Sequence, residues 1–163
     1  MFKDKLIESN IIDLYNNIEL PLSKVLAKME LNGISIDKTI LEDMKEDIKL
    51  KIEKVSQEIY LLAGKEFNIS SPKQLGEILF DELKLPYAKK NKTGYVTDAN
   101  VLGKLIEYPI VRLILEYRLL NKLYTTYLEG ILSSVLPDGK IHTIYTQALT
   151  RTGRLSSIEP NLQ

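Results

Sequence analysis

The chain has 163 residues, 44% apolar and 27% charged, a composition typical of one globular domain, or of one domain plus a fragment of another. It has no cysteine, so disulfides and thiolate metal sites are excluded. No apolar run comes near the roughly 20 residues of a membrane span and there is no signal-peptide stretch, so we expect a cytoplasmic protein without a membrane partner. The 22 basic and 22 acidic side chains balance, but residues 86–163 hold 10 basic and 6 acidic ones, which is weak evidence that this half faces an anion.

Helical periodicity dominates the first half of the chain. Pro21 opens a helix whose apolar residues recur every three or four positions and which Gly33 ends. A long amphipathic helix is predicted for residues 38–63, with Asp37 as its N-cap and Gly64 as its stop. Its apolar stripe is narrow, and such a stripe also suits one strand of a coiled coil.

The third predicted helix has a stronger start signal. Ser71 is placed to cap it, Pro72 occupies its first turn, and Gln74 completes a capping box. This helix is predicted to end near Leu83. A basic loop with a glycine turn follows over residues 86–95.

Two more helices are predicted before the pattern changes. A short one runs from Thr97 to about Ile106, and a long one, opened by a proline, covers residues 109–134. Residues 140–146 are β-branched and aromatic without helical period, so they predict a strand, and Thr152-Gly153 predicts a hairpin or loop turn. A strand or hairpin with nothing to pair against is marginal, so residues after about 137 are expected to be loosely ordered unless they pack on a partner or a neighbouring molecule.

The residues alone predict no active site. His142 is the only histidine, and a lone histidine in a strand is more often structural than catalytic. The carboxylates of residues 38–63 mostly alternate with lysines, as on a solvated helix face. Neither a phosphate-binding glycine motif nor a histidine–carboxylate metal spacing is present. No catalytic residue, metal ligand or cofactor site is therefore predicted.

Two helical clusters suit a polyanion. At a helix start, backbone N–H groups and the hydroxyls of Ser70 and Ser71, with Asn68, could hold a phosphate, although capping alone explains the serines. Arg118 and Lys122 lie one helical turn apart, a spacing of about 6 Å that is comparable with neighbouring phosphates on one strand. Ordinary surface charge on an amphipathic helix is the alternative for this second pair.

A third cluster is the basic loop, which contains Lys89, Lys90 and Lys92 followed by Thr93. Such a loop can follow a phosphate backbone. An exposed surface loop without any ligand explains the same residues about equally well.

Residues 147–163 are polar and rich in turns, with no capping or core pattern of their own. Thr152-Gly153-Arg154-Leu155-Ser156-Ser157, followed by Glu159-Pro160-Asn161-Leu162-Gln163, resembles the opening palm signature of the family A DNA polymerases, of the bacterial DNA polymerase I type. The resemblance covers about residues 12–163. The further segments that look like the family's thumb are, in order, Glu19-Leu20-Pro21-Leu22, Met29-Glu30, Asn32-Gly33-Ile34, Phe67-Asn68, Ser71-Pro72-Lys73-Gln74-Leu75, Lys92-Thr93-Gly94-Tyr95 and Tyr117-Arg118.

The resemblance implies a mainly α fold. It is a thumb-like bundle with two long antiparallel helices, 38–63 and 109–134, and a small helical tip at about 67–107, followed by a short C-terminal β segment of a truncated palm. The implied domains are a linker or the end of a preceding exonuclease-like domain at 1–18, the thumb at 19–136 and the start of the palm at 137–163.

The resemblance also implies DNA binding. The family's thumb grips primer–template duplex through the phosphate backbone and the minor groove, without sequence specificity, in DNA replication and repair. Arg154 matches an arginine that reaches into the minor groove, where adenine N3 and thymine O2 occupy nearly equivalent places for either orientation of the pair. The DNA-contacting positions implied are Asn68, Ser70, Ser71, Lys89, Lys92, Thr93, Arg118, Lys122, Gln147, Thr150, Arg154 and Asn161.

The family's catalytic carboxylates, in an Asp-Tyr-Ser and a His-Asp-Glu motif, and its nucleotide-binding fingers helix match nothing in this chain. Two-metal phosphoryl transfer needs those carboxylates to hold magnesium. We therefore expect no catalysis and no cofactor from this chain alone, with palm and fingers as its protein partner and magnesium needed by the complete polymerase. Two alternatives stay open: a helical protein–protein interaction module, slightly favoured by the zero net charge, and one subunit of a split polymerase completed in trans.

Overall fold

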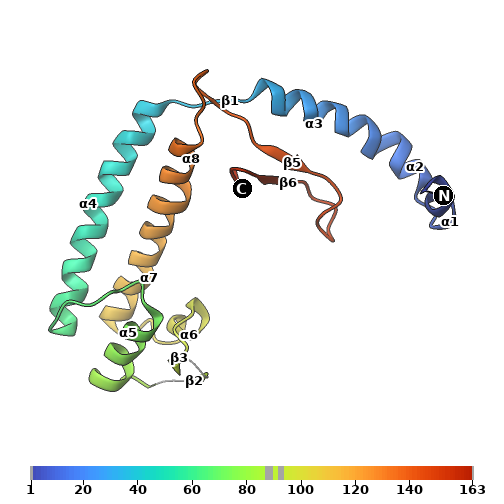
Figure 1. Ribbon diagram of the computed structural model, residues 1–163. Coiled ribbons are helices and arrows are strands. Elements are labelled where there is room, and N and C mark those ends of the chain that lie inside the picture. Colours follow the sequence, from blue (N-terminus) through green and yellow to red (C-terminus); the bar gives the residue numbers. More distant parts are fainter. Residues whose placement is uncertain (1, 87–89, 92–93, 163) are drawn as a thin grey trace. The chain divides into compact units, whose positions relative to one another are not determined.

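The computed structural model describes residues 2–86, 90–91 and 94–162, with Asn91 through its backbone alone (Figure 1). It is mainly helical, with a few short antiparallel strands, so the predicted fold class is confirmed. The chain divides into two compact units, here called unit 1 (Met1–Lys38 with Gly130–Gln163) and unit 2 (Thr39–Glu129). No helix in the described part of the chain is both long and apolar enough to cross a membrane.

Unit 1 begins with helices. Gly33 ends α3 as predicted, and its N–H donates to the Met29 carbonyl at 3.0 Å. The prediction that Pro21 opens this helix is wrong, because helical residues run without a break from Ile12 to Asn32 and Glu19 is already helical, with a φ of −64° and a ψ of −45°. Gly33 has a φ of +66° and a ψ of 176°, a conformation that is essentially restricted to glycine. The helical elements here are α1 (Phe2–Glu8), α2 (Ile12–Leu14), the π-helical η1 (Tyr15–Glu19), α3 (Leu20–Asn32) and α8 (Gly130–Ser133).

The strands of unit 1 differ from the prediction. The expected strand at 140–146 is two strands, broken at residues 142–143, and each has an antiparallel partner. Ile34 pairs with Ile141, and Tyr145 pairs with Ser157 across a turn that contains Gly153. The hairpin turn predicted at Thr152-Gly153 is therefore confirmed, whereas the expectation that nothing was available for pairing is wrong. The strands are β1 (Ile34–Ser35) with β4 (Lys140–Ile141), and β5 (Ile144–Thr146) with β6 (Ser156–Ile158).

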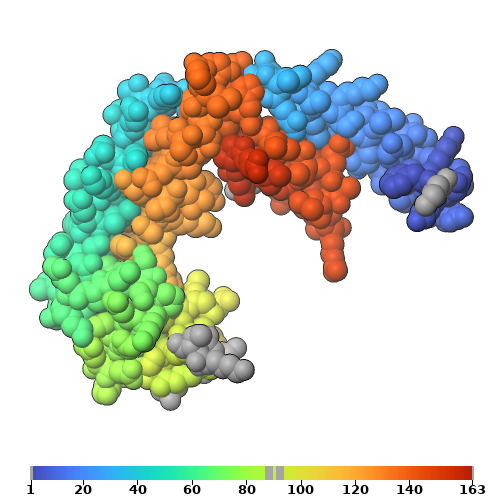
Figure 2. All heavy atoms as spheres, in the orientation of Figure 1, coloured from blue at the N-terminus to red at the C-terminus, as the bar shows by residue number. Residues whose placement is uncertain are grey.

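Unit 2 contains two long helices that run antiparallel and side by side, α4 and the succession α7–η3, as both views show (Figures 1 and 2). Both predicted long helices are confirmed, and α4 has the predicted bounds. The helices and strands of unit 2 are α4 (Lys38–Ala63), α5 (Pro72–Gly76), the π-helical η2 (Glu77–Glu82), β2 (Lys90–Asn91), β3 (Gly94–Tyr95), α6 (Ala99–Gly103), α7 (Pro109–Lys122) and the π-helical η3 (Leu123–Glu129).

The core of unit 2 joins the long helices to the small helical region between them. On α4, burial is confined to Val55 and Ile59, whereas Ile40 and Met44 of the same stripe are 56% and 46% exposed. The buried core residues are Val55, Ile59, Ile69, Leu75, Leu79, Phe80, Leu85, Leu102, Leu105, Ile110, Val111 and Ile114. This packing fixes the end of α4 and the start of α7 against α5, η2 and α6.

Two local predictions for unit 2 need correction. The short helix begins at Ala99 rather than Thr97, because Asp98 caps it by accepting the Val101 N–H at 2.8 Å. The predicted basic loop contains a hairpin in which Lys90 pairs with Tyr95.

Candidate nucleic-acid interface

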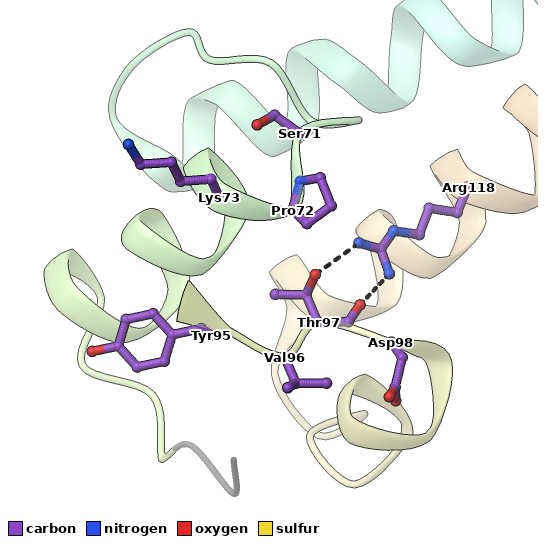
Figure 3. A pocket seen from close by; sticks show the side chains of 8 residues that line it. All are labelled: Ser71, Pro72, Lys73, Tyr95, Val96, Thr97, Asp98 and Arg118. Atoms are coloured by element: carbon purple, nitrogen blue, oxygen red, sulfur yellow. Dashed lines mark hydrogen bonds between the residues drawn. The ribbon is translucent and has the colours of Figure 1, made fainter. Parts of the chain in front are cut away.

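A surface pocket of about 600 Å³ lies in unit 2, between the start of α5, the segment after β3 and the middle of α7 (Figure 3). It brings together Ser71 and Arg118, which the sequence analysis placed in two separate clusters. Lys73 and Thr97 were not predicted as site residues, although Lys73 lies within one of the motifs that resemble the polymerase family. The lining residues are Ser71, Pro72, Lys73, Tyr95, Val96, Thr97, Asp98 and Arg118.

Arg118 is the most constrained cation of this pocket. Its Nη1 donates to the Thr97 carbonyl and its Nη2 donates to Thr97 Oγ1 at 3.2 Å. The side chain is partly buried, and this burial lowers the pKa of the guanidinium, opposed by the charge of Asp98. Within the described part of the chain no carboxylate forms an ion pair with it, so its direct partners are neutral oxygens. The guanidinium nevertheless stays charged, because the pKa of an arginine lies far above neutral pH.

The predicted cluster at the start of α5 forms a hydrogen-bonded network. Ser71 Oγ accepts the Gln74 N–H at 3.4 Å, as a cap should. Gln74 Oε1 does not return to Ser71, as a capping box requires, but accepts the Asn68 N–H at 2.8 Å, so that half of the prediction is wrong. The Ser71 N–H instead donates to the Asn68 carbonyl at 3.0 Å, so it does not need the side chain of Gln74 as an acceptor. Asn68 Oδ1 accepts the Ser70 N–H at 3.0 Å.

The start of α5 and the middle of α7 are also joined directly. Ser70 Oγ lies 3.3 Å from the hydroxyl of Tyr117, the residue before Arg118. Lys122, one turn further along α7, is exposed. Two of the three predicted polyanion clusters therefore lie together in unit 2. Of the third cluster, Lys89, Lys92 and Thr93 lie outside the described residues, and Lys90 Nζ is 4.0 Å from the centre of the Tyr95 ring.

The remaining predicted DNA-contacting residues lie in unit 1. The Gln147 amide donates to Glu19 twice, to its carbonyl at 3.0 Å and to its carboxylate at 2.8 Å. Thr150 Oγ1 donates to the Arg154 carbonyl at 2.8 Å, which closes the turn between β5 and β6. The side chains of Arg154 and Asn161 are exposed. Gln147 thus has a structural partner, whereas Arg154 is accessible to a ligand.

Comparison with known proteins shows the family of the chain. The family model described as DNA polymerase family A matches residues 38–163. The chain belongs to DNA polymerase family A. Among its relatives, it is 54% identical over 165 residues to DNA polymerase I of Bacillus caldotenax, with 99% of this chain and 19% of that protein covered. It is 52% identical over 160 residues to DNA polymerase I of Lactococcus lactis subsp. cremoris, with 98% and 18% covered.

A solved structure shows the same fold. It is the POL domain of Pol1 from M. smegmatis in complex with DNA primer-template and dNTP, with a TM-score of 0.87 and 41% identity, covering 98% of this chain and 29% of that one. The family A chain thus spans about a fifth of the length of the curated relatives it matches. Within the described residues, no group of three histidine, aspartate or glutamate side chains is placed to hold a metal ion.

His142 has a structural role in this family A chain. Its Nδ1 lies 2.7 Å from the Glu30 carbonyl and its Nε2 lies 2.9 Å from Asp138 Oδ2. Both partners only accept, so the doubly protonated ring satisfies both contacts. The hydrogen bond to Asp138 is the main cause that raises the pKa of His142, followed by the Glu30 carbonyl, while desolvation and, less strongly, the charge of Lys140 oppose the increase. The same contact lowers the pKa of Asp138.

The stability of unit 1 is therefore expected to depend on pH through this pair. The contribution of His142 is fully present below its ordinary pKa of 6.5 and is lost as the pH rises through the raised value. The contribution of Asp138 to stability is present above its ordinary pKa of 3.8 and is lost as the pH falls through the lowered pKa. His142→Gln should flatten the alkaline side of the profile, measured as urea unfolding midpoints between roughly pH 5.5 and 9. An alkaline limb of unchanged slope in this variant would assign the dependence to other groups.

Proposed function

We propose that this segment grips primer–template duplex DNA through the phosphate backbone and the minor groove, without sequence specificity, as part of a DNA polymerase that acts in replication and repair. The observation that carries the proposal is the partly buried Arg118, whose direct partners are two neutral oxygens and which lines an open pocket. A partly buried charge is costly unless it is paired. A phosphate oxygen supplies the missing anion, and a planar guanidinium matches phosphate geometry.

The neighbours of Arg118 support a phosphate ligand. Ser71 and Lys73 line the same pocket, and exposed Lys122 follows one helical turn along α7. Contacts of this kind fix a protein on DNA without reading its sequence. The related POL domain from M. smegmatis was solved in complex with primer-template DNA, which agrees with a duplex as the ligand.

We assign the minor-groove part of the grip to unit 1. Arg154 is exposed beside the turn that Thr150 closes, so its guanidinium is accessible to the acceptors of a minor groove. Asn161, whose side chain is exposed, belongs to this part of the proposed interface, whereas the Gln147 amide is already bonded to Glu19. The proposed domains stay as inferred from the sequence: a linker at 1–18, the thumb at 19–136 and the start of the palm at 137–163.

The proposal gives this segment binding and no chemistry. Catalysis and nucleotide binding are assigned to the rest of the polymerase, and the cytoplasm is kept as the proposed location.

The proposal is tested by fluorescence anisotropy of a labelled primer–template duplex, titrated at several salt concentrations. The parent chain should bind duplexes of different sequence equally and lose affinity steeply with salt, because each phosphate contact releases counterions. Arg118→Ala and Lys122→Ala should each weaken binding to all duplexes alike and reduce the slope of log K against log[salt] by about one.

Arg112 provides the matched control. It is an exposed arginine on the same helix that lines a different pocket, with Leu61 and Leu62 of α4. Arg112→Ala should leave affinity and slope close to those of the parent. Equal losses of affinity in all three variants would show that binding depends only on the total positive charge and would reject the assignment of Arg118 and Lys122. Absence of binding at low salt would reject the DNA grip and favour a helical protein–protein interaction module.

A further inference from the structure

We propose that Thr97 is a positioning residue that holds the guanidinium of Arg118 in the orientation that a phosphate needs. The inference rests on the proposed function, because it concerns the same pocket. Thr97 is only 5% exposed, and it lies 21 positions before Arg118 in the sequence, on a different element. A phosphate bound at the surface would contact Arg118, so Thr97 acts through Arg118.

The contact between these residues is a two-point one. The carbonyl and the hydroxyl of Thr97 accept from two different nitrogens, Nη1 and Nη2, of the one guanidinium (Figure 3). Two acceptors on one residue fix the plane of the guanidinium, which a single hydrogen bond does not. A guanidinium has five N–H donors. Thr97 uses two of them, so three remain for a ligand.

Thr97 is itself held in place from both sides. Before it, Tyr95 packs on Gly76 so closely that a Cβ at Gly76 would lie 2.9 Å from Tyr95 Cβ, and the Tyr95 hydroxyl donates to Asp81 at 2.5 Å. After it, Asp98 caps α6. The branched side chain of a threonine is also restricted at χ1. The two acceptors therefore form a fixed pair.

A fixed acceptor pair has a functional consequence. A free arginine side chain loses much rotamer freedom when it binds a ligand, and this loss weakens binding. An arginine that Thr97 already orders loses less. The segment at Thr97 is also non-helical where the sequence predicted a helix start, and this backbone conformation directs the carbonyl of Thr97 to Arg118 instead of to a helical turn.

Thr97→Val tests the inference, because valine keeps the shape and the backbone carbonyl but removes the hydroxyl. We expect duplex affinity to fall roughly three- to tenfold, less than the full contribution of one hydrogen bond to a charged group, because the Thr97 carbonyl still holds the guanidinium. The salt slope should not change, because the charge of Arg118 remains. Thr97→Ser should bind within about twofold of the parent. Ser56→Ala is the control for hydroxyl removal, since the Ser56 hydroxyl donates to the Ile52 carbonyl within α4.

The decisive comparison repeats Thr97→Val in an Arg118→Ala background. A positioning residue should have no further effect there, whereas a merely structural residue would weaken binding by the same factor in both backgrounds. Equal loss in both backgrounds, or no loss in the parent background, overturns the inference.

A measurement without DNA separates this inference from the proposed function. The order parameter of the Arg118 Nε–Hε group, obtained by NMR relaxation, should fall in Thr97→Val and be retained in Thr97→Ser. An unchanged order parameter in Thr97→Val overturns the positioning role even if the chain binds DNA. If the parent chain does not bind duplex DNA, the proposed function fails, and the functional role of Thr97 fails with it whatever the order parameter shows.

Discussion

Ile114→Ala should destabilise unit 2 by about 3–4 kcal/mol, near the upper part of the range for large-to-small changes in a core. Ile114 is completely buried, and it lies in one cluster with Val55 and Ile59 of α4 and with Leu79 of η2. Removing its side chain leaves a cavity between these elements, and a well-packed interior closes such a cavity only in part. Because Ile114 lies one helical turn before Arg118, the change should also loosen the proposed phosphate pocket.

Leu119→Ala is the matched control for this prediction. Leu119 is on the same helix but is 60% exposed, so its truncation should change the free energy of unfolding by no more than about 0.5 kcal/mol. Urea unfolding followed by circular dichroism measures both variants, with amide hydrogen exchange to assign the change to unit 2. Similar free energies for the two variants would mean that this cluster does not hold the unit together.

The sequence predicted the long helices well because their signals are local. Proline in a first turn, glycine after a last turn and an apolar period of three to four residues are all read within a few positions. The predicted range 38–63 coincides with α4, and 109–134 coincides within one residue with α7, η3 and α8. The π-helical segments were not predicted, since the same apolar periodicity is compatible with a helix that is locally wider.

The predictions failed where a partner lies far away in the sequence. The strand at Lys140–Ile141 pairs with Ile34–Ser35, more than 100 residues earlier, and no local pattern indicates such a pairing. The break in the predicted strand has a similar cause. The Thr143 hydroxyl lies 2.9 and 2.8 Å from the carbonyl oxygens of Ile158 and Pro160, and His142 lies between Glu30 and Asp138.

The candidate site was predicted in part. Residue types and the resemblance to the polymerase family named Ser71 and Arg118, which the fold brings to one pocket. Thr97 was missed because a single threonine carries no motif, and its importance depends on the position of Arg118 on another helix. The placement of Gln147 against Glu19 was equally invisible in the sequence. The DNA contacts themselves remain predictions.

Gly33→Ala should destabilise unit 1 by about 3 kcal/mol through two separate effects. The first is backbone strain, because φ +66° with ψ 176° is a region that residues with a Cβ avoid. The second is a collision, since a Cβ would lie 2.7 Å from Cε1 and 2.8 Å from Nε2 of His142. The ring has hydrogen-bonding partners on both sides, Glu30 and Asp138, so it cannot move away without losing them.

Gly139→Ala separates these two effects. Gly139 belongs to the same unit and has a φ of +77°, but a Cβ there would meet nothing within 4 Å. It should therefore cost only the backbone strain, about 1–2 kcal/mol. Urea unfolding at several pH values measures both variants, and Gly33→Ala should in addition lose the alkaline dependence that His142 gives the parent, whereas Gly139→Ala should keep it. If both variants lose the same stability and keep the same pH profile, the close packing of Gly33 on His142 does not contribute to the fold. If they differ as expected, the protonated His142 joins the end of α3 to the β1–β4 strand pair, and only a glycine at position 33 leaves room for its ring.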